Sequence, residues 1–417
     1  MNRVKLSDVA KIELSSIDKK ISNDEIPVKL CNFTDVYYNW AITTDVISSC
    51  MNGSVKESEY KKLVLKKGQV AITKDSETRD DIGMPCYIAD NFDNAVLAYH
   101  CALITPNNDL LSGKYLNALL NTSYARKSFE NQAGGSGQRY TLSKEAIENI
   151  QIHLPPIEIQ KLLGSFFSNI DKKIQNNKKQ IETLESLAKT IYDYWFVQFD
   201  FPNEEGKPYK SSGGKMVWNE ELKREIPEGW NIDNLYFIAD YINGLACQNY
   251  RPKDYEQGMS VIKIREMQDG ITENTELVST NIPNKYKIKN GDILFSWSAS
   301  LIVSYWYHGI GGLNQHIFKV IPKEGVDDEY VYRQLSEYVF KFKKIAESRK
   351  TTMGHITSDH LKQSRIVIAP VSIINKYASK SKYLREKIKT ISIENNKLKK
   401  LKDYLLPLLM NGQVKIQ

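Results

Sequence analysis

The chain has 417 residues, of which 41% are hydrophobic and 26% charged, and its net charge is +7. This composition is typical of a soluble protein with two or more domains. No apolar run approaches about 18 residues and the N-terminus lacks a signal-peptide core, so we expect a cytoplasmic protein without a membrane partner.

The cysteines indicate reduced thiols, and the charges indicate a basic C-terminal segment. The five cysteines are scattered and show no C-x-x-C spacing, which favours reduced, buried thiols over disulfides or a metal site. Residues 370–417 carry 11 Lys and Arg against 3 Asp and Glu, whereas the rest of the chain is close to neutral. This basic segment fits either a nucleic-acid partner or a solvated helix face.

Residues 1–155 are predicted to form an α+β domain. A helix is expected over Leu110–Asn131, before a glycine-rich loop at 133–140. Short apolar runs bounded by turn residues predict five strands before that helix, at Val28–Asn32, Leu63–Leu65, Gln69–Thr73, Cys86–Ala89 and Cys101–Thr105.

Two loops of this domain are candidate nucleic-acid contacts. The loop 73–81 follows a strand and is dense in side chains that can pair with base edges, although an ordinary polar turn has the same composition. The loop 133–140 matches neither G-x-G-x-x-G nor the P-loop pattern, so it suits an approach to a nucleic-acid backbone, or a flexible connection, better than nucleotide binding. The candidate residues are Lys74, Ser76, Arg79, Gln138, Arg139 and Tyr140.

A long helix is predicted over 156–200. Apolar residues return in steps of four and three from Leu163 to Trp195, which is the heptad pattern of a coiled coil. Pro155 and Pro156 fit the first turn of such a helix. Its C-terminal part contains an aromatic cluster that suits either binding of a partner protein or packing within the chain. The cluster residues are Tyr194, Trp195, Phe196 and Phe199.

The second half of the chain repeats the first. Residues 201–229 are predicted to be a linker because they contain Gly, Ser and Pro. Residues 230–369 repeat the α+β pattern, and residues 370–410 repeat the heptad helix after a shift of 214 positions. The candidate nucleic-acid contacts of this half are Lys263, Arg265, Trp297, Arg349, Lys350, Thr351 and His355.

The repeat also predicts how the two helices pair. Tandem copies related by a pseudo-twofold axis place their helices antiparallel. Each seam contains one asparagine, Asn177 or Asn395, and the two face each other if the centre of symmetry lies near the middle of the helix. A buried polar pair of this kind fixes the register of a coiled coil.

Catalytic motifs are missing from the sequence. It contains no D-P-P-Y or N-P-P-F tetrapeptide and no H-E-x-x-H motif, and the spacing of His355 and His360 is not typical of a metal site. We therefore predict no catalytic residues and no metal ligands.

The arrangement resembles the specificity (S) subunit of type I restriction-modification systems. The most specific matches are Leu154-Pro155-Pro156-x-x-x-Gln160, the core from Asn176-Asn177-Lys178 to Glu182-Thr183-Leu184, and Tyr194-Trp195-Phe196-Val197-x-Phe199-Asp200. Ile226-Pro227-x-Gly229-Trp230 also resembles the linker of that family, and the second helix departs from the first match at Ala369 and Ile374. The resemblance implies two tandem α/β target recognition domains joined by an antiparallel coiled coil. Each domain would read one half of a bipartite site in double-stranded DNA.

The same resemblance implies the partners. Two methyltransferase (M) subunits and restriction/motor (R) subunits would assemble with the chain, and S-adenosylmethionine, ATP and Mg²⁺ would be bound by those subunits. Two other functions remain open: a regulatory or non-specific DNA-binding scaffold, and a stand-alone endonuclease.

Overall fold

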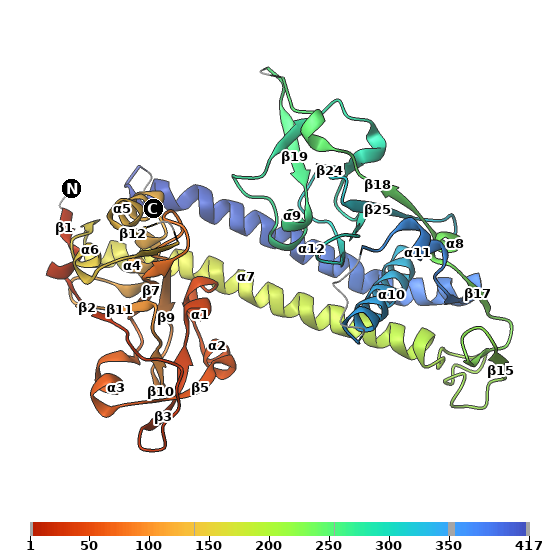
Figure 1. The fold of residues 1–417 in the computed structure, drawn as a ribbon, viewed down its shortest axis with the longest axis horizontal. Helices are drawn as coiled ribbons and strands as arrows, with labels where there is room; N and C mark the ends of the chain where they lie inside the picture. Colours follow the sequence, from red (N-terminus) through yellow and green to blue (C-terminus); the bar gives the residue numbers. More distant parts are fainter. Residues whose placement is uncertain (1–2, 137, 254, 349–354, 414–417) are drawn as a thin grey trace. The chain divides into compact units, whose positions relative to one another are not determined.

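The computed structural model describes residues 3–136, 138–253, 255–348 and 355–413 (Figure 1). It divides into two compact units, residues 1–176 with 397–417 and residues 177–396. The division runs through the two long helices, α7 (Ile157–Tyr192) and α12 (Val371–Met410). Each unit therefore holds one α+β region together with the helix segments that cover it.

The first unit is built on two main sheets. The first has the order β2-β11-β7-β9-β4 and the second the order β5-β3-β10-β6, while β12-β13-β8 and β1-β14 form smaller sheets. The strands are β1 (Arg3–Lys5), β2 (Ala10–Leu14), β3 (Ile26–Cys31), β4 (Ala41–Ile42), β5 (Met51–Val55), β6 (Val64–Leu65), β7 (Val70–Thr73), β8 (Asp75–Ser76), β9 (Pro85–Ile88), β10 (Phe92–Leu97), β11 (Cys101–Pro106), β12 (Gly134–Ser136), β13 (Arg139–Thr141) and β14 (Gln151–His153).

Short helices connect these strands. They are α1 (Phe33–Tyr37), α2 (Thr44–Ser49), α3 (Glu57–Leu63), α4 (Gly113–Leu120), α5 (Ser123–Gln132) and α6 (Lys144–Glu148). The single helix predicted over Leu110–Asn131 is therefore wrong, because Thr122 starts a new helix. Its Oγ1 accepts a hydrogen bond from the backbone N–H of Ala125 at 3.3 Å and caps α5. The glycine-rich loop is also not a plain connection, since it forms the hairpin β12–β13.

The second unit repeats this topology. Sheet β18-β25-β22-β23 corresponds to β2-β11-β7-β9, sheet β20-β19-β24-β21 to β5-β3-β10-β6, and β17-β26 to β1-β14. In both units the second sheet has one parallel pair, β3–β10 or β19–β24. The strands are β17 (Asn231–Asp233), β18 (Ala239–Asn243), β19 (Gly258–Ile262), β20 (Leu277–Ser279), β21 (Lys287–Ile288), β22 (Ile293–Ser296), β23 (Ile302–Tyr305), β24 (Gly311–Leu313), β25 (Ile317–Pro322) and β26 (Ile366–Ile368), with helices α8 (Leu235–Ile238), α9 (Ile264–Asp269), α10 (Asp328–Ser348) and α11 (Ser358–Lys362).

The segment predicted as a linker is an ordered part of the second unit. It contains the hairpin β15 (Met216–Asn219) and β16 (Arg224–Pro227). Phe201 and Ile226 are buried in the same core cluster as Trp230. The Gly-, Ser- and Lys-rich composition therefore belongs to tight turns on a packed hairpin, and not to a free tether.

The long helices pair antiparallel, as the repeat predicts. Within the second unit, the ring of Tyr192 lies 6.3 Å from that of Tyr377, and Asn177 meets Asn395. Residue numbers thus rise along α7 while they fall along α12. Within the first unit, Phe167 of α7 and Leu409 of α12 belong to one buried cluster.

The asparagines face each other in the buried seam. Nδ2 of Asn177 donates hydrogen bonds to Oδ1 of Asn395 at 2.8 Å and to Oε2 of Glu394 at 2.7 Å. Asn177 is 1% exposed and Asn395 6%. This is the pairing that the repeat arithmetic predicts.

The entry into α7 explains one sequence motif. Gln160 is buried, and its Nε2 donates to the carbonyl oxygens of Leu110 and Pro155 while its Oε1 accepts from the N–H of Ser112 at 3.0 Å. The amide therefore ties the start of the helix to the loop before α4. The corresponding Ile374 of the second copy is buried among apolar side chains instead.

Two expectations from composition can be compared with the fold. All five cysteines are free and buried, as predicted. Among the described residues, none of the helices is long and apolar enough to span a membrane.

Candidate nucleic-acid interface

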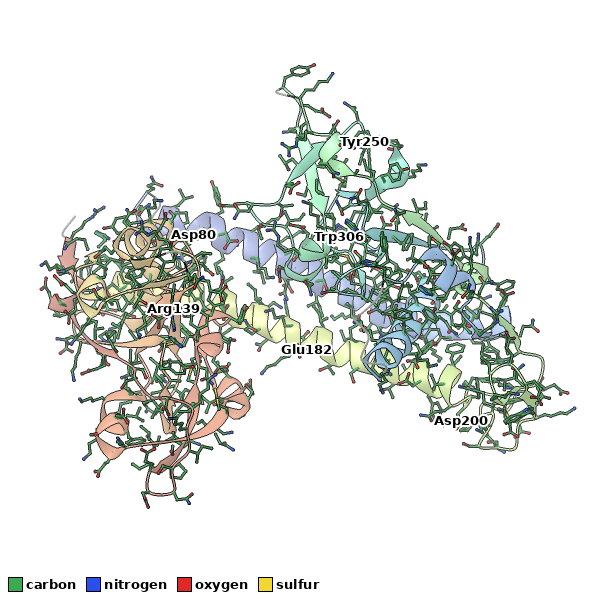
Figure 2. The ribbon with its side chains drawn as sticks, in the orientation of Figure 1. Asp80, Arg139, Glu182, Asp200, Tyr250 and Trp306 are labelled. Atoms are coloured by element: carbon green, nitrogen blue, oxygen red, sulfur yellow. The ribbon has the colours of Figure 1, made fainter. Side chains whose placement is uncertain are left out.

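A groove with a volume of about 520 Å³ opens in the first unit. Its polar walls include Asp75, Ser76 and His100, and its exposed rim includes Gln138 and Arg139. Arg139 is labelled in Figure 2, together with Asp80 of the loop 73–81. Two of the candidate loops therefore meet at this groove, because β8 pairs with β13 through Tyr140 and Ser76.

Asp75 is the centre of a hydrogen-bond network at the floor of the groove. Its Oδ1 accepts from the hydroxyl of Thr141 at 2.6 Å, and its Oδ2 lies 2.5 Å from Nδ1 of His100 and 3.2 Å from Nζ of Lys74. Burial alone would raise the pKa of the Asp75 carboxyl, but the hydrogen bonds from Thr141 and His100 and the charge of Lys74 hold it below its ordinary value. Asp75 is thus a buried carboxylate.

Arg139 is attached to this network from outside. Its Nη2 lies 2.5 Å from Nδ1 and 3.0 Å from Nε2 of His100, and 3.7 Å from Oδ2 of Asp75. His100 has a φ of 70°, an uncommon value for a residue other than glycine. Asp75, His100 and Arg139 therefore form a continuous polar stack from the interior to the surface.

The other wall of the groove is aromatic and acidic. Phe33 stacks on Tyr37, and the hydroxyl of Tyr37 donates to Oδ2 of Asp81 at 2.6 Å. Burial, followed by this hydrogen bond, raises the pKa of Tyr37 to about 12. Tyr38 beside it is 75% exposed, and Glu77 is also exposed.

The candidate residues of the first unit have different surroundings. Ser76, Gln138 and Arg139 line the groove, whereas Lys74 lies beneath it beside Asp75. Arg79 donates to the carbonyl of Ala133 at 3.2 Å and lies over the ring of Tyr140, so these two candidates support the hairpin.

Asp75 and His100 are missing from the set of sequence candidates. The match between Tyr99–Pro106 and Gln315–Pro322 could have identified His100, because it aligns His100 with His316.

Backbone hydrogen bonds place Trp297 of the second unit in the same way as Lys74 of the first. The N–H of Lys74 donates to the carbonyl of His100 at 2.8 Å, and the N–H of Trp297 donates to the carbonyl of His316 at 3.3 Å. A second matching pair runs from Leu142 N–H to the Lys74 carbonyl at 2.7 Å and from Ile356 N–H to the Trp297 carbonyl at 3.0 Å. Trp297 thus corresponds to Lys74.

An aromatic group surrounds Trp297. Its Nε1 donates to Oδ1 of Asn243 at 3.0 Å, and its ring lies 5.5 Å from that of His316 and 5.7 Å from that of His355. Both histidines are exposed. The structure therefore brings together two of the predicted residues, Trp297 and His355.

The remaining candidates of this half are not gathered at Trp297. Lys263 is ion-paired with Glu276, and Nη2 of Arg265 lies 2.8 Å from Oε1 of the buried Glu266. Their charges are thus balanced within the unit. The last three candidates, Arg349, Lys350 and Thr351, lie outside the described residues.

The aromatic cluster after α7 packs largely within the chain. Trp195, Phe196 and Phe199 are buried, and Phe196 lies 4.9 Å from Tyr330 between ring centroids. Of the four predicted partner contacts only Tyr194 is exposed, at 40%. Packing within the chain was the alternative that the sequence left open, and it accounts for the other three.

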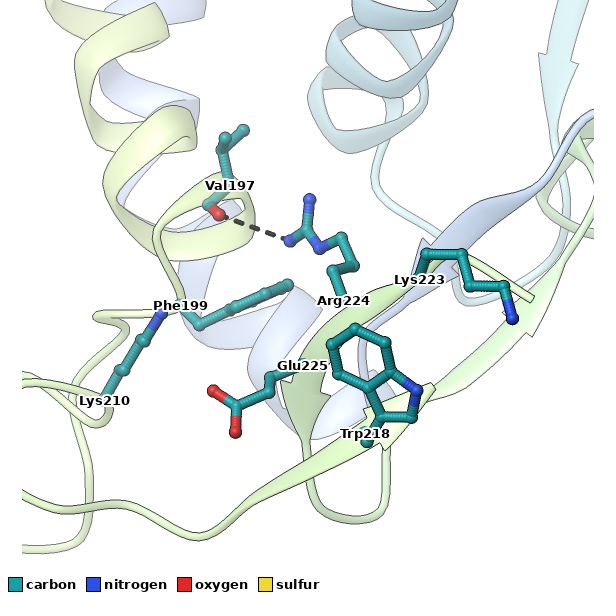
Figure 3. A pocket seen from close by; sticks show the side chains of 7 residues that line it. All are labelled: Val197, Phe199, Lys210, Trp218, Lys223, Arg224 and Glu225. Carbon is teal, nitrogen blue, oxygen red and sulfur yellow. Dashed lines mark hydrogen bonds between the residues drawn. The ribbon is translucent and has the colours of Figure 1, made fainter. Parts of the chain in front are cut away.

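A small cavity lies where this helix meets the hairpin β15–β16 (Figure 3). It has a volume of about 460 Å³ and is lined by Val197, Phe199, Lys210, Trp218, Lys223, Arg224 and Glu225. The guanidinium of Arg224 lies 4.6 Å from the centroid of Phe199 and donates to the Val197 carbonyl at 3.4 Å. Arg224 thus closes the end of the helix, and Trp218 stays exposed.

No group of three or more metal-binding side chains occurs among the described residues.

The two α+β units share the same pattern of backbone hydrogen bonds. Each contains a segment of α7 and a segment of the antiparallel α12, so the chain has a duplicated two-domain architecture. The family model described as "Type I restriction modification DNA specificity domain" matches residues 1–186 and 227–403, which is most of the chain. The chain belongs to this family.

Several known proteins are similar to it. The Type I restriction enzyme HindI specificity subunit of Haemophilus influenzae is 23% identical over 435 residues, covering 89% of this chain and 93% of that protein. The Type I restriction enzyme MjaIX specificity subunit of Methanocaldococcus jannaschii is 27% identical over 333 residues, covering 75% and 72%. The crystal structure of a type I restriction-modification S subunit from M. genitalium has the same fold, with a TM-score of 0.56, 13% identity and coverage of 98% and 95%.

Proposed function

We propose that this chain is the DNA-specificity subunit of a type I restriction-modification complex. Each α+β unit reads one half of a bipartite site in double-stranded DNA, and the paired helices hold the two readers at a fixed spacing. The proposal rests on the family to which the chain belongs and on the similarity to specificity subunits along most of its length.

The observation that carries the proposal is that the two units share backbone hydrogen bonds but present different side chains at equivalent positions. Backbone hydrogen bonds place residue 74 and residue 297 equivalently. The first position is a lysine beside the buried carboxylate of Asp75, and the second is a tryptophan between two histidines. Because base edges differ in their donors, acceptors and methyl groups, chemically different linings favour different bases. The expected site is therefore asymmetric.

The catalytic steps are assigned to other subunits. The sequence has no methyltransferase or nuclease motif, so methyl transfer requires the methyltransferase (M) subunits and cleavage requires the restriction/motor (R) subunits. S-adenosylmethionine, ATP and Mg²⁺ are accordingly proposed to bind to those partners. Exposed Tyr194 and Trp218, on the surface where α7 meets the hairpin, are the side chains that we propose for contact with an M subunit.

The test is an exchange of one half. The chain is co-expressed with its methyltransferase partner, and the methylated sites are mapped by genome-wide sequencing. Residues 230–369 are then replaced by the corresponding segment of a relative. We expect one half of the site to change while the other half and the methylation level stay the same.

Two outcomes would refute this function. Methylation that ignores sequence, or changes in both half-sites after the exchange, would favour a non-specific scaffold. Methyl transfer or Mg²⁺-dependent cleavage by the purified chain alone would identify it as an enzyme.

A further inference from the structure

The guanidinium of Arg139 is exposed and keeps donors that are not used within the described part of the protein. Its side chain is 59% exposed, and its contacts with His100 and Asp75 are made through Nη2. Among the described residues, Nε and Nη1 of Arg139 make no hydrogen bond. The five N–H donors of arginine form a fixed fork, in which the parallel pairs are Nε–H with one Nη2–H and Nη1–H with the other Nη2–H. When one Nη2–H is directed to His100, the other Nη2–H and its neighbour still form a two-donor edge.

The position of this fork is fixed from below. In one tautomer of His100, Nδ1–H donates to Asp75 and Nε2 accepts from Nη2 of Arg139 at 3.0 Å. The contact of 2.5 Å between Nη2 and Nδ1 is then not a hydrogen bond. Asp75 is in turn held by Thr141. On the backbone, Arg139 belongs to the central strand of the sheet β12-β13-β8.

The charge of the groove also disfavours a phosphate. Its lining contains the carboxylates of Asp75, Glu77 and Asp81 against one arginine. Asp75 and Asp81 are hydrogen-bonded to neighbours, but exposed Glu77 would repel a phosphate and can accept from the amino group of a base. A base edge with two acceptors fits the Arg139 fork, and guanine presents this pattern through O6 and N7 in the major groove.

We propose that Arg139 reads a guanine in the half-site of the first unit, and that Asp75 and His100 are its positioning residues. This inference rests on the proposed function. It names the base class at one position, which neither the family nor the similar proteins supply. Leu142 and Ile356 occupy equivalent positions 214 residues apart, so Arg139 corresponds in sequence to Met353, which is outside the described residues. Methionine cannot donate to O6 and N7, so this contact is expected in one half-site only.

The experiment uses the complete complex of the chain with its methyltransferase partner, and duplexes that carry its mapped site. Each guanine is replaced in turn by 7-deazaguanine, which lacks the N7 acceptor, or by inosine, which keeps N7 and O6. We expect one 7-deazaguanine position in one half-site to weaken binding about 5- to 150-fold, the range of about 1–3 kcal/mol for a good bidentate pair, whereas inosine there has little effect. Arg139→Ala should weaken binding to the natural site and remove the difference between guanine and 7-deazaguanine.

Two further variants separate positioning from folding. Asp75→Asn and His100→Gln should reduce the guanine preference while the other half-site is still read normally. Arg3→Ala, an exposed arginine of the same unit outside the groove, should leave the preference unchanged.

The inference is overturned if the complex methylates a specific bipartite site but Arg139→Ala retains the full 7-deazaguanine penalty. It is also overturned if neither half-site contains a sensitive guanine. A complex without sequence preference would instead refute the proposed function.

Discussion

Replacing Asp75 by asparagine tests the network that holds the first groove. The substitution keeps the size of the side chain but removes its charge. One oxygen can still accept from Thr141, whereas the new NH₂ group faces Nδ1 of His100 and the ammonium of Lys74. At least one hydrogen bond to a charged group is lost, and such bonds contribute about 1.5–3 kcal/mol each.

The local free energy of opening should therefore fall by about 2–3 kcal/mol. Since about 1.4 kcal/mol corresponds to a factor of ten, the backbone amides of β13 and Leu142 should exchange about 30- to 150-fold faster. Hydrogen–deuterium exchange with mass spectrometry measures this directly at neutral pH. Asp80→Asn is the matched control, because Asp80 lies on the same loop and is exposed (Figure 2).

The stabilisation by Asp75 should depend on pH in a known direction. Because the folded-state pKa of Asp75 is lowered, its stabilising effect is present above the unfolded-state pKa of about 4 and is lost as the pH falls through the lower folded-state value. The difference between wild type and Asp75→Asn should therefore shrink in acid. A change of less than about threefold in exchange at neutral pH, or a difference that grows in acid, would refute this role of the network.

Other contacts lead to three further predictions. Asn177→Leu and Asn395→Leu should each destabilise the helix pair by about 1–3 kcal/mol, whereas the double variant should lose less than their sum, as a urea-unfolding double-mutant cycle would show. Gln160→Leu, which removes three buried hydrogen bonds to the backbone, should lower the melting temperature of the first unit by several degrees in calorimetry. Glu329→Ala removes the partner of the buried Arg333 on α10 while Glu185 remains paired with it, and should cost about 1.5–3 kcal/mol in urea unfolding; a loss below about 0.5 kcal/mol would contradict this.

The helices could be predicted from sequence because their signals are local and periodic. The heptad seam runs through both copies, and the repeat offset then fixes which residues meet, including Asn177 and Asn395. Such a prediction needs only that the same pattern occurs twice. The break at Thr122 was missed because a capping residue inside an apolar helical pattern changes no period.

The groove could be predicted only in part, because its contacts are long-range. Ser76 and Arg139 were candidates from loop composition, but Asp75 and His100 are 25 positions apart and meet only through sheet pairing. The left-handed backbone of His100 has no sequence signature. The hairpin β15–β16 was missed for a different reason: Gly and Ser are as frequent in tight turns as in flexible linkers.

The duplicated frame explains how two different readers can share one fold. The hydrogen bonds that place residues 74 and 297 join backbone atoms, so they do not depend on the side chain at either position. A lysine in one unit and a tryptophan in the other therefore leave the supporting strands paired in the same way. Exposed side chains such as Arg139 and Gln138 can change with little cost to the core, whereas Tyr140 and Trp297 pack against it. Specificity can accordingly change in one half of the protein while the fold, and the reading of the other half-site, remain intact.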